Sequence, residues 1–285
     1  MLVTGKEILA HADKNKYAVG AFNMNNMEII QAIAGAAQET QSPVIMQASQ
    51  GAIKYAGIEY IAAMGKLVAS KIDVPVVLHL DHGTDFEEIM ACIRHGFSSV
   101  MIDASKYPLD KNIELTKEIV KIAHSVGVSV EAEIGKIGGT EDNISVDDAE
   151  ATYTDPEEAR IFVEETGVDS LAVAVGTAHG VYKGVPKLDF DRIEKINALV
   201  SVPLVLHGSS GVDYPSLEKA ISKGIAKINI DTDIRAAFSG AVNAFTRENP
   251  NELDPRKILG PARQAMTEVI KEKMEVFGSC HQAWK

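Results

Sequence analysis

Three histidines of this sequence each lie at or close after the end of a short apolar run, and imidazole is a favoured ligand of zinc and other divalent metals. They are His82 in "LDHG", His179 in "GTAHG" and His207 in "LVLHG". Three histidines with one open position form the ligand set of a catalytic zinc. A single histidine is more often an ordinary packed or surface residue, so this predicted metal site depends on all three meeting in the fold.

Asp81 stands directly before His82, and a carboxylate there has two roles open to it. It could orient an imidazole that binds the metal, or it could move a proton as a general acid or base. His79 lies two positions earlier on the same apolar run. Because alternate residues of a strand share a face, we expect His79 on the side of Asp81 but deeper, as a hydrogen-bonded interior residue and not a ligand.

Two polar loops further along the chain have the composition of an anion site. Residues 207–211 read "HGSSG" and residues 229–232 read "NIDT", each between an apolar run and a helix. Glycines let backbone N–H groups converge on an anion, serines add hydroxyls, and a helix start adds a favourable dipole. Either loop alone could be a simple cap or turn. The candidate residues are Gly208, Ser209, Ser210, Gly211, Asn229, Asp231 and Thr232, with Arg235 and Arg256 as further phosphate candidates.

The elements that must position these groups are short apolar runs, rich in Val, Ile and Leu, which predict strands buried on both faces. Segments of helical period separate them, so the sheet is expected to be parallel and the fold to be of the α/β class. Eight such repeats can close into a (β/α)8 TIM barrel. An open doubly wound sheet is the alternative, although no glycine-rich dinucleotide fingerprint follows the first run. The predicted strands are 17–22, 43–49, 74–80, 99–104, 128–134, 170–176, 203–208 and 227–231.

A barrel of this kind carries its active site at the carboxyl ends of its strands, and its phosphate site after strands seven and eight. The three histidines, Asp81 and both polar loops all fall at those ends. After the eighth strand come predicted helices over 233–249, the last barrel helix, and 260–278, a C-terminal helical extension. Since no linker interrupts the pattern, residues 1–285 are expected to form a single domain.

One long polar stretch, residues 135–159, separates the fifth and sixth predicted strands. Long connections without regular structure are usually functional lids or disordered segments. We expect a lid here, with Gly135, Gly138 and Gly139 as hinges. Glu141 and Asp142 would lie on its moving part.

Composition excludes several classes of function. The net charge of the 285 residues is −12 and no run of lysine or arginine is present, which argues against nucleic acid as a partner. An anionic substrate would therefore need a local positive site. The two cysteines have no metal-type spacing, and no signal peptide or membrane-spanning run is found, so a reduced cytoplasmic protein is expected.

Seven motifs resemble, in order and spacing, those of the class II, metal-dependent ketose-bisphosphate aldolases. They cover essentially the whole chain. They read "LHLDHG", "MIDAS", "VEAEIGKIGGTED", "GTAHG", "LHGSSG", "KINIDT" and "DPRK". The resemblance implies a (β/α)8 barrel, a zinc cofactor, in many members a monovalent cation (Na+ or K+), and a homodimer, with a homotetramer as the alternative.

The resemblance also implies residue roles. His82, His179 and His207 match the zinc ligands, and Asp81 matches the acid/base. Asp103 and Glu133 match a second metal position, Glu141 an acidic lid residue that moves the C3 proton, and Arg256 an arginine that reaches a substrate phosphate across a dimer interface. The positions matching substrate contacts, chiefly to dihydroxyacetone phosphate, are Asn23, Ser49, Gly180, Gly208, Ser209, Ser210, Asn229, Ile230, Asp231, Thr232 and Arg235.

The expected reaction is the reversible cleavage of fructose 1,6-bisphosphate to dihydroxyacetone phosphate and glyceraldehyde 3-phosphate, as in glycolysis and gluconeogenesis. Gly83, Asp231 and Arg235 favour the fructose branch over the tagatose 1,6-bisphosphate branch, whereas "GTAHGVY" is more similar to the tagatose branch.

A Schiff-base aldolase is disfavoured, because Lys227 begins the eighth predicted strand, at the wrong end. A phosphosugar-binding protein without turnover is the non-catalytic alternative.

Overall fold

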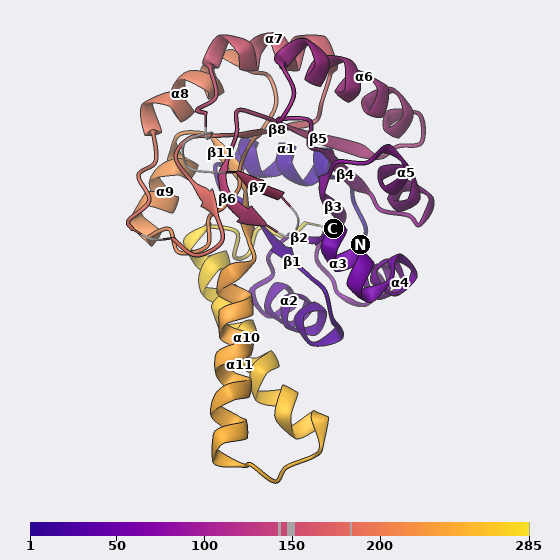
Figure 1. Cartoon of the computed structure of the whole chain (residues 1–285), viewed down its shortest axis with the longest axis vertical. Helices are drawn as coiled ribbons and strands as arrows, with labels where there is room; N and C mark the ends of the chain where they lie inside the picture. Colours follow the sequence, from indigo (N-terminus) through magenta and orange to yellow (C-terminus); the bar gives the residue numbers. More distant parts are fainter. Residues whose placement is uncertain (142–143, 147–151, 183, 285) are drawn as a thin grey trace.

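A computed structural model describes residues 1–141, 144–146, 152–182 and 184–284, and these form a closed parallel barrel of eight strands (Figure 1). The predicted (β/α)8 architecture is confirmed. Neighbouring strands follow the order β1-β11-β10-β8-β5-β4-β3-β2 around the barrel. The bounds are β1 (Val19–Asn23), β2 (Val44–Ser49), β3 (Val76–Gly83), β4 (Ser99–Ile102), β5 (Ser129–Ile134), β8 (Ser170–Val173), β10 (Leu204–Leu206) and β11 (Ile225–Ile230).

Helices form the outer layer around the strands (Figure 1). Short polar side chains begin several of them: Asn26, Asp85 and Asp155 each accept a backbone N–H of the first helical turn. The bounds are α1 (Gly5–Asn15), α2 (Met27–Thr40), α3 (Gln50–Ala56), α4 (Ile58–Lys71), α5 (Phe86–Arg94), α6 (Leu109–Ser125), α7 (Pro156–Thr166), α8 (Phe190–Leu199), α9 (Tyr214–Ser222), α10 (Thr232–Glu248) and α11 (Pro255–Val276).

The amino ends of the strands are closed by α1. Its apolar side chains, among them Ile8 and Leu9, pack with Val19, Ile45 and Val77 of the barrel. Its first turn is also fixed by a hydrogen bond from the backbone N–H of Gly5 to the Ser129 hydroxyl at 2.8 Å. The carboxyl ends of the strands lie on the opposite side of the barrel, away from α1.

The polar stretch between β5 and α7 corrects one prediction, because part of it has regular structure. The strands β6 (Gly138–Glu141), β7 (Ile144–Val146) and β9 (Ala178–His179) form a small sheet in the order β7-β6-β9. Gly139 pairs with His179, and a Cβ at Gly139 would lie 2.2 Å from the His179 carbonyl oxygen. The predicted hinge glycine therefore lets β6 approach the strand that carries His179.

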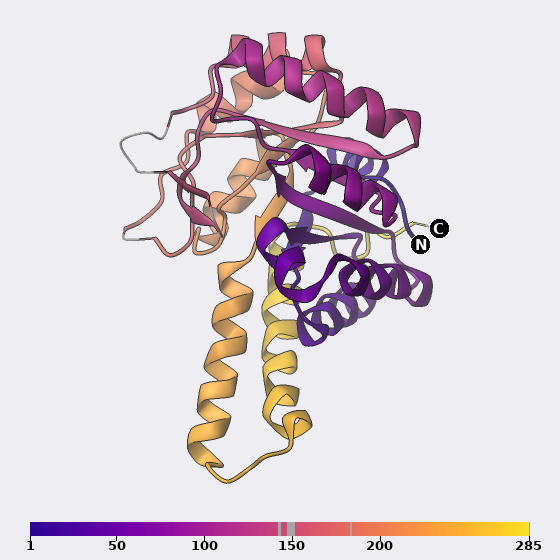
Figure 2. The same cartoon turned by 45° about the vertical axis from the view of Figure 1, so that its right-hand side comes forward.

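The helices α10 and α11 extend from the barrel as a long antiparallel arm (Figures 1 and 2). The arm begins beside the barrel, and α11 starts near its far end and returns to pack on α2. A C-terminal helical extension was predicted and is confirmed. The helix α11 begins at Pro255 and not at residue 260, because Asp254 caps it by accepting the Arg256 N–H. Among the described residues, no helix is both long enough and apolar enough to cross a membrane.

Candidate active site

The three histidines at the strand ends meet at the mouth of the barrel. His82 is the second-to-last residue of β3 and has a left-handed backbone conformation (φ 50°). His179 lies on β9, and His207 directly follows β10. Their ligand atoms lie within 4.8 Å of one another. His82 and His207 are buried and His179 is half-buried. The structure thus brings together the three imidazoles that the sequence placed on separate strands.

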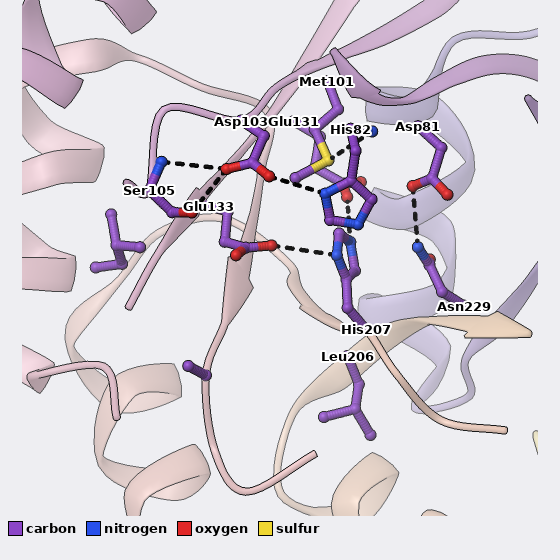
Figure 3. A network of polar contacts seen from close by, with 12 residues as sticks. Asp81, His82, Met101, Asp103, Ser105, Glu131, Glu133, Leu206, His207 and Asn229 are labelled. Carbon is purple, nitrogen blue, oxygen red and sulfur yellow. Dashed lines mark hydrogen bonds and ion pairs between the residues drawn. The ribbon is translucent and has the colours of Figure 1, made fainter. Parts of the chain in front are cut away.

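Carboxylates contact two of these rings, those of His82 and His207, and fix their orientation (Figure 3). The Nδ1 of His82 lies 2.9 Å from Oδ2 of Asp103. The Nε2 of His207 lies 2.9 Å from Oε1 of Glu131, and its Nδ1 lies 3.2 Å from Oε2 of Glu133. His82, Asp103 and Glu133 form a second group whose ligand atoms are equally close.

The charges of this cluster suit a divalent cation. Burial alone would raise the pKa of Asp103, but the hydrogen bond and charge of His82 and the hydrogen bonds from Ser105 together outweigh burial and hold that pKa well below the usual range. Burial would likewise raise the pKa of Glu131, but the Lys227 ammonium, with His207 and His79, holds that pKa far below normal. Burial lowers the pKa of His207, yet the hydrogen bonds to Glu131 and Glu133 raise it to about 9. Imidazoles beside ionised carboxylates are the donor set that zinc binds in proteins.

Asp81 is fully buried at the end of β3 and is held by side-chain amides. The Nδ2 of Asn23 and the Nε2 of Gln47 each donate to its Oδ2 at 2.9 Å. The Nδ2 of Asn229 donates to its Oδ1 at 3.1 Å. An ionised carboxylate offers about four acceptor positions, so three amides leave one for a substrate hydroxyl.

A cavity of about 200 Å³ is lined by His179 and by Asn23 and Asn229, two of the residues that donate to Asp81. Gly208 allows its shape, because this residue has φ 61° and a Cβ there would lie 2.5 Å from the Ala178 carbonyl oxygen. Arg235 places positive charge at the cavity, with its Nε 2.7 Å from Oδ1 of Asp231. The lining residues are Asn23, His179, Gly180, Val181, Gly208, Ser209, Ser210, Asn229, Asp231, Thr232 and Arg235.

Among the described residues, the candidates that do not line this cavity include Ile230, Ser49, Arg256 and Gly211. The side chain of Ile230 is buried in the apolar core, and the hydroxyl of Ser49 caps α3 while its backbone lies beside Asp81 in the β2–β3 register. Arg256 lies on the arm with its side chain 89% exposed. Glu141 ends β6, but its side chain lies outside what the structure describes, as does all of Asp142.

Two residues of the site escaped the sequence analysis: Gln47, which contacts Asp81, and Glu131, which contacts His207. Each is a polar residue within a buried strand. Gln47 stands two positions before the predicted site residue Ser49, and Glu131 stands two positions before Glu133. Since alternate strand residues share a face, that spacing is the signal by which they could have been found.

Metal-type ligands and a polar cavity at the carboxyl ends of barrel strands are the features of a TIM-barrel enzyme site. A comparison with family models makes the class specific. The model described as class-II fructose-bisphosphate aldolase matches residues 3–282, and the chain therefore belongs to that family.

Relatives are similar over the full length of the chain. It is 49% identical over 306 aligned positions to the fructose-bisphosphate aldolase of Thermus caldophilus, covering 99% of this chain and 100% of that protein. It is 47% identical over 285 positions to the fructose-bisphosphate aldolase of Geobacillus stearothermophilus, covering 99% of each. The crystal structure of the YdjI aldolase from Escherichia coli K12 is 39% identical, with a TM-score of 0.89 and complete coverage of both chains.

Family membership and these relatives establish the reaction class. The protein is a class II aldolase, a carbon–carbon lyase of carbohydrate metabolism. The non-catalytic alternative raised by the sequence is thereby set aside.

Proposed function

We propose that this protein, as one barrel domain, catalyses the reversible, zinc-dependent cleavage of fructose 1,6-bisphosphate to dihydroxyacetone phosphate and glyceraldehyde 3-phosphate. The observation that carries the proposal is the meeting of three imidazoles at the barrel mouth, where Asp81 precedes His82 and His179 lines the polar cavity. The names of the full-length relatives support the choice of substrate.

His82, His179 and His207 would hold the zinc, with Asp103 and Glu133 available for a second metal position. When bound, zinc supplies Lewis-acid polarisation of the carbonyl and hydroxyl oxygens of the ketose. The carboxylates of Asp103 and Glu131 keep the rings of His82 and His207 in place for it. We also propose that the enzyme uses a monovalent cation, Na+ or K+.

Asp81 moves the proton on which cleavage depends. Breaking the C3–C4 bond requires loss of the C4 hydroxyl proton, and the acceptor position left on Asp81 can take it. The same carboxyl group returns the proton when the two products condense. Glu141, at the end of β6, is proposed to move the C3 proton.

The cavity binds the ketose phosphate and thereby orients the reacting carbons. Ser209, Ser210 and Thr232 offer hydroxyls, and Thr232 begins α10, whose amino end favours an anion. Arg235 supplies the local positive charge that a chain of net charge −12 needs for a phosphate. The binding energy at the phosphate thus serves catalysis at the other end of the ketose.

The test is to follow cleavage of fructose and tagatose 1,6-bisphosphate separately, before and after chelation and after zinc is added back. We expect faster cleavage of the fructose substrate, loss of activity on chelation, and recovery with zinc. A preference for tagatose bisphosphate, which differs only at C4, would overturn the substrate while leaving the mechanism.

A matched pair of histidine variants tests the metal site. His179→Ala should lose bound zinc and activity, whereas His281→Ala, at an exposed C-terminal histidine, should retain both. Full zinc content and activity in His179→Ala would contradict the three-histidine site.

We also propose a cytoplasmic homodimer, with a homotetramer as the alternative. Both cysteines are unpaired, which suits a reducing compartment. Arg256 lies in the first turn of α11 and pairs with Asp254, and we propose that its guanidinium reaches a substrate phosphate in a partner's site. Mixing inactive Arg256→Ala and Asp81→Ala subunits should restore about a quarter of the activity through random pairing. No recovery in subunits shown to exchange would contradict this role.

A further inference from the structure

The centre of the barrel holds a buried ion pair that the proposed chemistry does not yet use. Lys227 of β11 is 1% exposed and Glu131 of β5 is 2% exposed. The Nζ of Lys227 donates to Oε1 of Glu131 at 2.9 Å and to Oε2 at 2.8 Å. Both carboxylate oxygens are therefore held by one ammonium group.

Such a pair is not explained by stability alone. The interior of a TIM barrel is usually filled by branched apolar side chains. Removing two charges from water costs more than their mutual attraction commonly returns, and apolar replacements of buried pairs are often neutral or stabilising. A lysine and a glutamate at this depth are therefore reason to look for a role toward the site above them.

The contacts of Glu131 lead directly to a proposed zinc ligand. Its Oε1, already held by Lys227, lies 2.9 Å from the Nε2 of His207. A carboxylate only accepts, so Nε2 donates to Glu131 and is not available to a metal. The other nitrogen, Nδ1, lies 3.2 Å from Oε2 of Glu133 and is the one that could release its hydrogen and bind a metal.

Lys227 also contacts a second buried residue, His79. Its Nζ lies 3.5 Å from the Nε2 of His79, whose Nδ1 lies 2.8 Å from the hydroxyl of Ser99. Because an ammonium only donates, the Nε2 of His79 accepts and its Nδ1–H donates to Ser99. His79 is thus the hydrogen-bonded interior residue that its place in the strand predicted, and it limits the positions open to the lysine.

We propose that Lys227 is a positioning residue for the metal site, acting through Glu131. Its ammonium holds the carboxylate so that Oε1 keeps the His207 ring turned with Nδ1 toward the metal. This inference rests on the three-histidine site proposed above. It assigns no contact between Lys227 and the substrate or the metal.

The experiment measures zinc affinity of the metal-free full-length proteins by competition with a chromophoric chelator, together with the thermal midpoint Tm. The variants are Lys227→Met, Glu131→Gln and their double variant. Lys273→Met is the control, since Lys273 is also buried and ion-paired, to Asp233 at 2.7 Å, but contacts none of the proposed ligands. Should Lys227→Met not fold, Lys227→Gln, which keeps one donor, replaces it.

We expect Lys227→Met to weaken zinc binding by about 10- to 100-fold, the range typical of groups that orient metal ligands. The double variant should bind zinc no more weakly than Glu131→Gln alone, because Lys227 acts through that carboxylate. The control should lower Tm and leave zinc affinity unchanged.

A merely structural lysine would give a different pattern. Lys227→Met would then lower Tm while zinc affinity stayed within about twofold of the parent protein, which would overturn the inference. Additive losses in the double variant would show that Lys227 does not act through Glu131, and would overturn it as well. A parent protein that binds no zinc would instead refute the proposed metal site itself, so the two failures are distinguishable.

Discussion

Two buried carboxylates in the same barrel are held in opposite ways. Asp81, at the carboxyl end of β3, receives hydrogen bonds from the neutral amides of Asn23, Gln47 and Asn229. Glu131, nearer the amino end of β5, receives both contacts of the Lys227 ammonium and lies against His207. Each is at most 2% exposed. Burial is the same, and only the partners differ.

The difference matches the chemistry proposed for each group. An ammonium beside Glu131 favours its ionised form at all working pH values, so its charge is constant and can fix a neighbouring ring. Amide donors orient Asp81 without placing a full charge against it, so it can take up and release a proton during the reaction. Proton transfer and ligand orientation are thus assigned to separate carboxylates.

The largest effect is expected from removing the proton-transfer carboxylate. Asp81→Ala should lower kcat by about 100- to 10,000-fold, the usual contribution of a general acid or base. Zinc content should not change, because Asp81 is absent from both groups of metal-type ligands found among the described residues. Steady-state kinetics and metal analysis of the purified variant check both statements.

An Asp81→Ala protein with unchanged turnover would remove Asp81 from the mechanism. A protein that lost its zinc would show that the two carboxylates do not have separate roles. Only loss of turnover with zinc retained supports the contrast with Glu131.

A smaller effect is expected from weakening the amide support of Asp81. Gln47→Leu removes the donor to Asp81 and a second hydrogen bond, at 2.6 Å, to Oδ1 of Asn23. Loss of buried hydrogen bonds costs about 1–3 kcal/mol, so kcat should fall by about 10- to 100-fold. Zinc affinity should stay unchanged, in contrast to Lys227→Met.

Gln31→Leu, at an exposed position of α2, is the matched control and should alter neither property. If Gln47→Leu weakened zinc binding instead of turnover, the amides around Asp81 would belong to the metal site, and the distinction between the two carboxylates would fail.

The sequence predicted the barrel and its eight strands, with strand ends that differ by up to three residues, for a physical reason. Apolar runs locate strands that are buried on both faces, and a parallel barrel brings all their carboxyl ends to one side. His82 and His207 could therefore be placed together although their positions are 125 residues apart in the sequence. The prediction that Lys227 begins the eighth strand was wrong. That strand begins at Ile225, and the lysine therefore lies inside the barrel.

The sequence could not predict contacts that depend on distant partners. Helical periodicity shows that α10 has an apolar face, but not that the helix leaves the barrel to pair with α11. Likewise, β6 has few apolar residues and forms because Gly139 can approach the backbone of His179. The pairing of Glu131 with Lys227 joins strands that are not neighbours in the barrel, so no local pattern contains it.

The smallest effect on activity is expected at the closed, amino-terminal end of the barrel. A Cβ at Gly5 would lie 2.8 Å from the hydroxyl oxygens of both Ser129 and Ser99, so Gly5→Ala should displace α1 slightly. Overpacking of this kind costs about 1–3 kcal/mol, and each kcal/mol lowers the Tm of a domain this large by about 2–4 °C. Calorimetry should therefore show a lower Tm while kcat stays within about twofold, because residues at this end of a TIM barrel serve stability.

The control for this variant is Gly35→Ala in the helix α2, where an added Cβ meets nothing within 4 Å and Tm should not fall. A sharp loss of kcat in Gly5→Ala would contradict the expectation. The Ser99–His79–Lys227 contacts would then transmit the displacement to the metal site. In that case the mouth of the barrel could no longer be treated as independent of its closed end, and the support of Glu131 would extend through the whole depth of the barrel.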